Sequence, residues 1–371
     1  MTRIRALLAA LVLSAAMLLG GGAPASQAVV APVAFQVPTS LDLHDGSLSK
    51  FGSTYYLYGT QYKCGFKWQI ASPWCGFGVS TAPSLAGPWS TPVTLFSPSD
   101  IDPWTGTTWQ AECGDGSAQG CFNGHMVQRS GWGMNDGVFI LWFNSPADYS
   151  RSHANAYNAL GCNSPTGPCG PSAGPPYGSY TKPSLTICIG NGDFGIINSG
   201  TPGGRPAIVC SLPSGVGLSI EELDKWGVNG TGVGVRNMAN LGVVEGPGGW
   251  WDAATNQYVG TFSDPQCGYC AGVATGYMTS PTLYGPWTAP TNLAAAGLPV
   301  AARRDISANS CGGQPRTVSV LDGQAYQGID LWTGDRNETN AGSLFVPLTM
   351  GTPTGTPGDG GIWRPPLTLA C

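Results

Sequence analysis

Five short segments with the pattern of strand cores recur along the chain, and each follows a single polar residue at a nearly constant interval. The segments are residues 52–59, 136–143, 204–211, 256–263 and 323–330. Two of them contain runs of aromatic and β-branched residues, 55–58 and 138–143, bounded by Gly and Asp, which is typical of buried strands. The polar residues, 7 to 11 positions before each segment, are Asp45, His125, Asp193, Glu245 and Gln314. If each pair belongs to one hairpin of a repeated sheet, the five polar side chains meet near a common axis.

The spacing of the segments predicts an all-β fold, a five-bladed β-propeller stabilised by disulfides. Successive segments begin 84, 68, 52 and 67 residues apart, and each interval can hold about four short strands, the size of a propeller blade. A Gly-Pro motif in residues 80–89 recurs in residues 279–287 and, more weakly, in residues 163–168. Two stacked β-sandwiches are the alternative, but they do not explain why a polar residue precedes each strand segment at a similar distance.

Helix signals are rare in this sequence. Residues 219–226 form the best candidate, because a Ser that can act as an N-cap is followed by acidic residues. We therefore expect one or two helical turns there and strands over most of the remaining chain.

The first 28 residues are typical of an export signal. Arg3 and Arg5 precede an apolar run over residues 6–19, and residues 26–28 fit a small-x-small cleavage site. The run is short for a membrane span, so we expect cleavage, secretion and no membrane attachment afterwards, with a retained anchor as the alternative. Without the two arginines, 14 basic and 21 acidic residues leave a net charge of −7, which argues against nucleic acid as a partner.

All 12 Cys lie after this signal, an even number in an exported chain, so disulfides are expected. Cys267 and Cys270 form a CxxC motif that could instead serve redox or zinc chemistry. The chain has no second such motif and only three His, so we predict no metal site there. Proximity in sequence and the position of the last Cys favour five pairs: Cys64–Cys75, Cys113–Cys121, Cys162–Cys169, Cys188–Cys210 and Cys311–Cys371.

Three of the five polar residues before the strand segments are carboxylates: Asp45, Asp193 and Glu245. Carboxylates that share a channel repel, which raises the pKa of at least one of them. One group can then stay protonated as an acid while another stays ionised as a base. Glycosidic bond cleavage needs such a pair, held roughly 6.5–9.5 Å apart when the anomeric centre is inverted.

The motifs around these carboxylates resemble glycoside hydrolase family 43. Residues 43–47 (Leu-His-Asp-Gly-Ser), followed by residues 54–59, are similar to the opening of that family. Residues 244–247 (Val-Glu-Gly-Pro) resemble its Glu-Gly-Pro motif, and residues 192–194 match its third-blade Asp less closely. The resemblance extends over about residues 38–350.

The resemblance implies a role for each carboxylate in a single catalytic domain over residues 29–371. Asp45 corresponds to the general base and Glu245 to the general acid, while Asp193 would orient the acid and tune its pKa. Arabinosides, xylosides and galactosides in plant or microbial polysaccharides are the implied substrates, cleaved with inversion by a secreted monomer.

The last predicted blade, residues 310–336, is similar to the subgroup that contains exo-β-1,3-galactanases. Those enzymes usually carry Gly in place of the first-blade base and hold the water with a fifth-blade Gln. This chain has both Asp45 and Gln314. Residues 123–126 also differ from the charged substrate contact of the family's second blade, so galactan is one possible substrate among several.

His44, His125 and Gln314 are predicted to bind substrate. His44 could instead brace Asp45, and His125 could be an ordinary core histidine. Asp42 is an alternative base, but it lies three residues before Asp45, so the two point to opposite faces of an extended strand. Only one of them can face the channel.

No cofactor is predicted, although a structural calcium could be bound by the loop acids Asp102, Glu112 and Asp115. Two other functions are compatible with the sequence. One is a non-catalytic carbohydrate-binding propeller, and the other is a related propeller enzyme with a carboxylate nucleophile, such as a fructosyl-transferring one.

Overall fold

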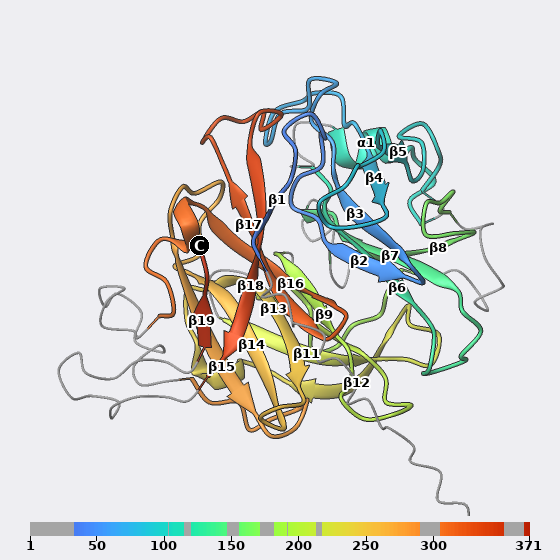
Figure 1. The fold of residues 1–371 in the computed structure, drawn as a ribbon. Coiled ribbons are helices and arrows are strands. Elements are labelled where there is room, and N and C mark those ends of the chain that lie inside the picture. Colours follow the sequence, from blue (N-terminus) through green and yellow to red (C-terminus); the bar gives the residue numbers. More distant parts are fainter. Residues whose placement is uncertain are drawn as a thin grey trace, which may run out of the picture. The chain divides into compact units, whose positions relative to one another are not determined.

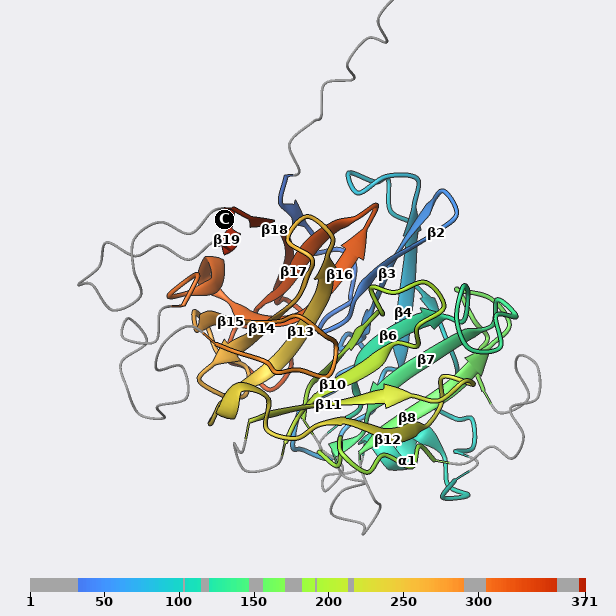
Figure 2. The ribbon, with the colours of Figure 1, turned by 90° about the horizontal axis from the view of Figure 1, so that it is seen from below.

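The computed structural model describes residues 33–102, 104–114, 120–146, 156–170, 182–190, 192–212, 217–289, 305–351 and 367–371. The predicted signal peptide, residues 1–28, lies outside these ranges. Residues 33–371 form one compact unit. Five antiparallel sheets follow one another around a common axis in chain order (Figures 1 and 2), which confirms the predicted five-bladed propeller.

Each blade is one sheet whose first strand lies nearest the axis. Blade one contains β2 (Leu48–Phe51), β3 (Thr54–Thr60), β4 (Phe77–Ala82) and β5 (Val93–Thr94). Blade two contains β6 (Phe122–Gln128), β7 (Phe139–Asn144) and β8 (Tyr157–Cys162). Blade three contains β9 (Phe194–Ile197), β10 (Ala207–Ser211), β11 (Leu218–Leu223) and β12 (Gly230–Val235). Blade four contains β13 (Glu245–Asp252), β14 (Gln257–Asp264) and β15 (Ala274–Ser280).

Blade five is built from both ends of the described chain. Its strands are β16 (Gln314–Leu321), β17 (Gln324–Leu331) and β18 (Gly342–Met350), with β1 (Phe35–Gln36) and β19 (Leu367–Leu369) both paired to β18. Because β1 precedes blade one in the chain, its pairing with blade five closes the ring. The disulfide Cys311–Cys371 also ties the C-terminal residue to the short 3-10 helix η4 (Ser310–Gly312).

The recurring sequence segments are the second strands of the blades, namely β3, β7, β10, β14 and β17. Most of their residues are buried because both faces of a blade pack against neighbouring blades. Phe143 of β7, for example, lies 5.1 Å from Phe77 of blade one, measured between ring centroids. Burying one such side chain contributes about 1.5–3 kcal/mol to folding.

The predicted helix over residues 219–226 is wrong, because β11 occupies most of this segment. Ser219 does not cap a helix; its hydroxyl accepts a hydrogen bond from the backbone N–H of Asn237. Glu221 is fully buried and accepts backbone N–H bonds from residues 186, 187, 188 and 232. Tertiary partners for this carboxylate therefore override the local helix signal. The one α-helix that lies wholly within the described residues is α1 (Trp109–Gly114); the 3-10 helices with described bounds are η2 (Met238–Asn240) and η4.

The Gly-Pro motif marks the same turn in three blades. Its Gly-Pro peptide bond is cis at Gly87–Pro88, Gly167–Pro168 and Gly285–Pro286. In two of these turns the following Trp donates its indole N–H to a carbonyl four residues earlier, Trp89 to Leu85 and Trp287 to Leu283. The sequence repeat is therefore a structural repeat.

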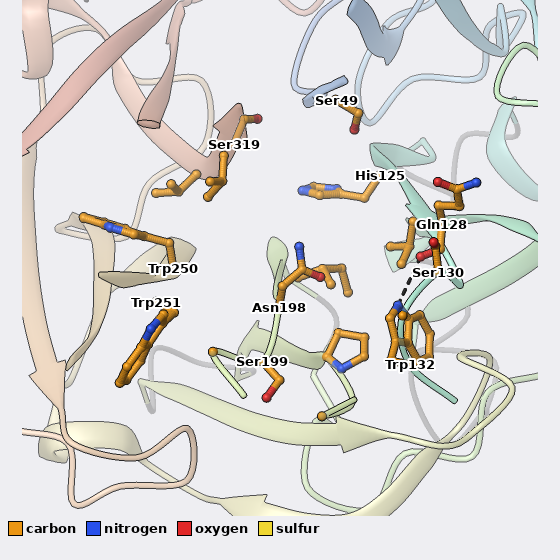
Figure 3. A pocket seen from close by; sticks show the side chains of 18 of the residues that line it. Ser49, His125, Gln128, Ser130, Trp132, Asn198, Ser199, Trp250, Trp251 and Ser319 are labelled. Atoms are coloured by element: carbon orange, nitrogen blue, oxygen red, sulfur yellow. Dashed lines mark hydrogen bonds between the residues drawn. The ribbon is translucent and has the colours of Figure 1, made fainter. Parts of the chain in front are cut away.

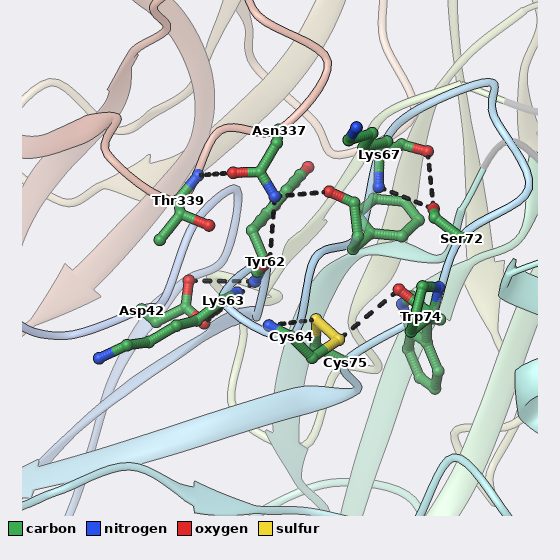
Figure 4. Close-up of a disulfide and its surroundings, with 12 residues drawn as sticks. Asp42, Tyr62, Lys63, Cys64, Lys67, Ser72, Trp74, Cys75, Asn337 and Thr339 are labelled. Atoms are coloured by element: carbon green, nitrogen blue, oxygen red, sulfur yellow. Dashed lines mark hydrogen bonds between the residues drawn. A yellow bond between two sulfur atoms is a disulfide. The ribbon is translucent and has the colours of Figure 1, made fainter.

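All five predicted disulfides are present, and Cys267 and Cys270 form a sixth. The Cys64–Cys75 bond closes a loop that follows blade one's second strand (Figure 4). The side-chain amide of Asn337, from the loop after β17, donates to the carbonyls of Tyr62 and Phe66 in this loop. The disulfide and the amide together fix a loop that reaches the axial pocket described below.

Candidate active site

A pocket of about 330 Å³ lies where the innermost strands begin. Of the five polar residues predicted to converge, four line it: Asp45, Asp193, Glu245 and Gln314. Glu245 and Gln314 are the first residues of β13 and β16, and Asp193 directly precedes β9. Residues far apart in sequence are therefore brought together because each blade starts at the same end of the axis.

Backbone irregularities turn these strand starts toward the pocket. The pairing register shifts directly after Glu245 and again after Pro315, as a β-bulge requires. Gly246 adopts φ +60°, and a Cβ there would lie 2.5 Å from the Pro315 carbonyl oxygen. The Gly of the Glu-Gly-Pro motif is thus needed both for its conformation and for the close approach of blades four and five.

Glu245 is 8% exposed, and one of its carboxyl oxygens accepts two hydrogen bonds. Its Oε1 accepts the Cys267 backbone N–H at 2.7 Å and the Gln314 side-chain amide at 2.7 Å. Burial is the main cause that raises the pKa of Glu245 well above its usual range, and the nearby Asp193 carboxyl raises it further. This carboxyl is therefore suited to remain protonated and to donate a proton.

Asp45 lies in the left-handed region at φ 50° and is 7% exposed. Its Oδ1 accepts the Thr60 hydroxyl at 2.7 Å. Burial raises the pKa of Asp45 well above its usual range, and the Asp330 carboxyl raises it further, whereas the Thr60 bond and the Arg316 charge favour the ionised form. Gly46, which follows it, has no room for a side chain, because a Cβ would lie 1.8 Å from the Tyr58 carbonyl oxygen.

Asp193 accepts a hydrogen bond from the side-chain amide of Asn123 at 2.8 Å. Burial raises the pKa of Asp193, the Asn123 bond opposes this, and the Asp330 carboxyl adds to it. Asn123 thus contributes a blade-two side chain to the pocket in the place where the sequence analysis expected His125. Asn123 has φ 60° and lies at the register shift in β6. Because of this bulge, the blade-two residue that faces the pocket is farther from its strand segment than its counterparts in the other blades.

Two charged residues of the pocket were not predicted as site residues, Arg316 and Asp330. Their side chains form an ion pair, with 3.2 Å between Arg316 Nε and Asp330 Oδ2, and both are nearly fully buried. Arg316 Nη1 also donates to the Gly46 carbonyl, next to Asp45. Among the described residues that line the pocket, Arg316 is the only cation facing four carboxyl groups. The sequence signal was present, since Asp330 ends the fifth strand segment and Arg316 lies two residues after Gln314.

The predicted residues His44 and His125 do not line the acid pocket. His44 Nε2 lies 3.2 Å from Asp42 Oδ1, so it braces Asp42 rather than Asp45. Asp42 accepts the backbone N–H groups of Tyr62 and Lys63, which agrees with the expectation that only one of the two aspartates faces the channel (Figure 4). His125 lies farther along β6 and lines a second cavity.

Two of the loop acids, Asp102 and Glu112, accept hydrogen bonds from residues of their own loop. Asp102 accepts bonds from Trp104 and Thr105, and Glu112 accepts the Thr107 hydroxyl, while Asp115 lies outside the described ranges. No group of three His, Cys, Asp or Glu in the described parts of the chain is arranged to hold a metal ion. No helix of the described residues is long and apolar enough to cross a membrane.

Aromatic side chains form one wall of the pocket. Tyr269 lies between Trp68 and Trp332, with ring centroids 4.9 and 4.7 Å away, and its hydroxyl is 2.6 Å from that of Tyr62. The apolar C–H face of a sugar ring can pack on such a wall. Tyr269 is held by the Cys267–Cys270 disulfide, whose loop also contacts Glu245 and Gln314.

We expect removal of this disulfide, by Cys267→Ser with Cys270→Ser, to impair the site. The hydrogen bond from the Cys267 N–H lowers the pKa of Glu245. Its loss would raise that pKa and move the alkaline limb of the pH–rate profile to higher pH. A displaced acid would lower kcat about tenfold or more, and loop closure predicts a loss of about 2 kcal/mol in unfolding free energy. The double variant Cys162→Ser, Cys169→Ser is the matched control. Its disulfide lies outside the pocket lining, so its removal should lower stability and leave the kinetics unchanged. Equal kinetic effects in both variants would contradict the expectation.

No family model matches this sequence, and no curated protein matches it. Solved structures do share the fold. An exo-β-1,3-galactanase from Phanerochaete chrysosporium, with β-1,3-galactotriose, has a TM-score of 0.61 and 18% identity over 85% of this chain and 64% of that chain. A family 43 β-1,3-galactosidase with galactodeoxynojirimycin has a TM-score of 0.54 and 14% identity over 87% and 93% of the two chains. An endo-1,4-β-xylanase from Bacteroides thetaiotaomicron has a TM-score of 0.53 and 15% identity over 89% and 95%.

The resemblance to family 43 is therefore confirmed for the fold. This chain spans less than two thirds of the length of the P. chrysosporium galactanase. The protein is thus a five-bladed propeller, a fold that it shares with these glycosidases, and its axial pocket is lined by four carboxyl groups.

Proposed function

We propose that the protein is an exported glycosidase that cleaves plant or microbial polysaccharides with inversion at the anomeric carbon. The observation that carries this proposal is the presence of Asp45, Asp193 and Glu245 in one buried axial pocket. Six disulfides support export, because such bonds persist in oxidising compartments. Galactans are the first substrates to test, since β-1,3-galactotriose is the ligand of a solved galactanase with the same fold.

In the proposed mechanism, Glu245 protonates the leaving oxygen while Asp45 takes a proton from the attacking water. Asp193 acts on Glu245 through its charge, which raises the pKa of the acid. The environment of Gln314 supports Asp45 as the base. Gln314 donates its amide to Glu245 and to the Cys267 carbonyl and accepts from Cys270, so its amide is engaged in positioning the acid. It is poorly placed to hold the water as well.

The proposal is tested by sugar release from β-1,3-galactan, arabinan and xylan, with proton NMR of the first product. We expect release from at least one polymer and an inverted anomeric configuration. A retained configuration would indicate a carboxylate nucleophile, as in the fructosyl-transferring alternative. No release by the folded protein from any polymer would favour the non-catalytic carbohydrate-binding alternative.

The buried acids also predict an unusual pH dependence. The base must be ionised, so activity is lost as pH falls through the raised pKa of Asp45; the acid must be protonated, so activity is lost as pH rises through the raised pKa of Glu245. Both limbs of kcat/KM should therefore lie above the ordinary carboxyl pKa, about 4. A profile with its acidic limb at or below that value would contradict this assignment of Asp45.

A further inference from the structure

A second and larger cavity, of about 620 Å³, lies at the other end of the innermost strands. The acid pocket is formed where these strands begin, whereas this cavity is lined by their later residues, such as Gly249 of β13 and Ser319 of β16. The loop after β9, with Asn198 and Ser199, forms another side (Figure 3). Its volume is within the range of small-molecule sites.

His125 projects into this cavity from β6 with one ring nitrogen unsatisfied (Figure 3). The side chain is 6% exposed, and its Nδ1 lies 2.7 Å from the Asn123 carbonyl, so Nδ1 carries the hydrogen and donates it. Nε2 is then an acceptor, and it has no hydrogen-bond partner among the described residues. Burial and the Arg316 charge lower the pKa of His125 to about 4, so the ring is uncharged at neutral pH. A buried acceptor without a donor is costly.

The remaining lining mixes polar and apolar groups and is nearly uncharged. It combines hydroxyl and amide groups, including Ser130 and Asn198, with the aromatic residues Trp132 and Trp251. The described lining contains no carboxylate and no Arg, and the ammonium group of its one Lys, Lys50, is paired with Asp322 at 2.6 Å. Charged ligands would find no free counter-ion here, whereas a neutral polyhydroxylated chain would find both hydrogen-bonding groups and apolar faces.

The aromatic part of the wall is held in a fixed position. Trp251 packs on the backbone of Gly200, where an added Cβ would lie 2.3 Å from the indole, and its ring is 4.8 Å from that of Tyr258. The Tyr258 hydroxyl accepts the Gly200 N–H at 2.8 Å, which ties the loop to blade four. A site with a preformed wall loses less entropy on binding.

We propose that this second cavity is a non-catalytic binding site for neutral oligosaccharide chains, separate from the acid pocket at the other end of the channel. The site would hold a polysaccharide on the protein without cleaving it, because no acid–base pair lines it.

Affinity electrophoresis in native gels that contain β-1,3-galactan, arabinan, xylan or β-1,3-glucan tests this proposal. All proteins carry Glu245→Gln so that no polymer is degraded. Asn198→Trp and Ser130→Trp each fill the cavity from an exposed position, which keeps the folding risk low. Val93→Trp is the matched control, since Val93 is 53% exposed on an outer strand and lines neither cavity. Thermal unfolding verifies that each variant is folded.

We expect at least one polymer to retard the parent and the control, and both plugging variants to bind it about tenfold more weakly. Retardation unchanged by either plug would place binding elsewhere and overturn the proposal, and so would the absence of retardation by every polymer. The assay does not depend on hydrolysis. A protein without glycosidase activity can therefore pass it, and an active glycosidase can fail it.

Discussion

Replacing Glu245 with Gln is expected to lower kcat on a polysaccharide by about 10²- to 10⁴-fold, because protonation of the leaving oxygen is lost. The substituted side chain keeps the shape of Glu245, and its carbonyl oxygen can still accept the hydrogen bonds from Cys267 and Gln314. We therefore expect an unchanged fold and a similar KM. The kinetic constants and the near-UV circular dichroism spectrum measure these two effects.

Two comparisons make this result specific to acid catalysis. An aryl glycoside with a dinitrophenolate leaving group needs little protonation, so E245Q should retain far more activity on it than on a polymer. Glu222→Gln is the control, since Glu222 is an ion-paired carboxylate outside the pocket lining and its loss should leave kcat almost unchanged. Equal losses on both substrates would show that Glu245 does not act as the general acid.

Replacing Asp45 with Asn is expected to have two opposite effects, a loss of activity and a gain in stability. The rate should fall by about 10²- to 10⁴-fold because the base is removed. Since burial and Asp330 raise the pKa of Asp45, its ionised form is disfavoured in the folded state. D45N removes this cost and should raise the unfolding free energy by about 1 kcal/mol at neutral pH.

The sign of the stability effect depends on pH. The gain should appear above the ordinary carboxyl pKa, where the unfolded chain ionises Asp45, and vanish at about pH 3, where both states are protonated. Asp136→Asn is the matched control with the opposite sign, because its pairing with Arg129 lowers the pKa of Asp136 and its loss should destabilise the fold. Denaturant unfolding at the two pH values measures both variants. A D45N enzyme with nearly full activity would instead favour a water held by Gln314.

The repeated strands and most disulfides could be predicted from the sequence because they depend on local patterns. The run over residues 138–143 is apolar throughout, and pairs such as Cys162–Cys169 are close in the chain. Glu245 was identifiable because a carboxylate between apolar strand residues and Gly-Pro is unusual. The helix expected at residues 219–226 failed because Glu221 is satisfied by backbone groups that are distant in sequence.

The number of blades and the order in which polar residues approach the axis could be predicted because strand patterns and their spacing are local properties of the chain. Which of those residues share a pocket depends on how the blades pack. A bulge in β6 brings Asn123 to the acids and leaves His125 in the other cavity, and the register of β16 and β17 pairs Arg316 with Asp330. A shift of one residue in register turns the side chains of a strand to the other face of its sheet, and the packing of neighbouring blades fixes that register.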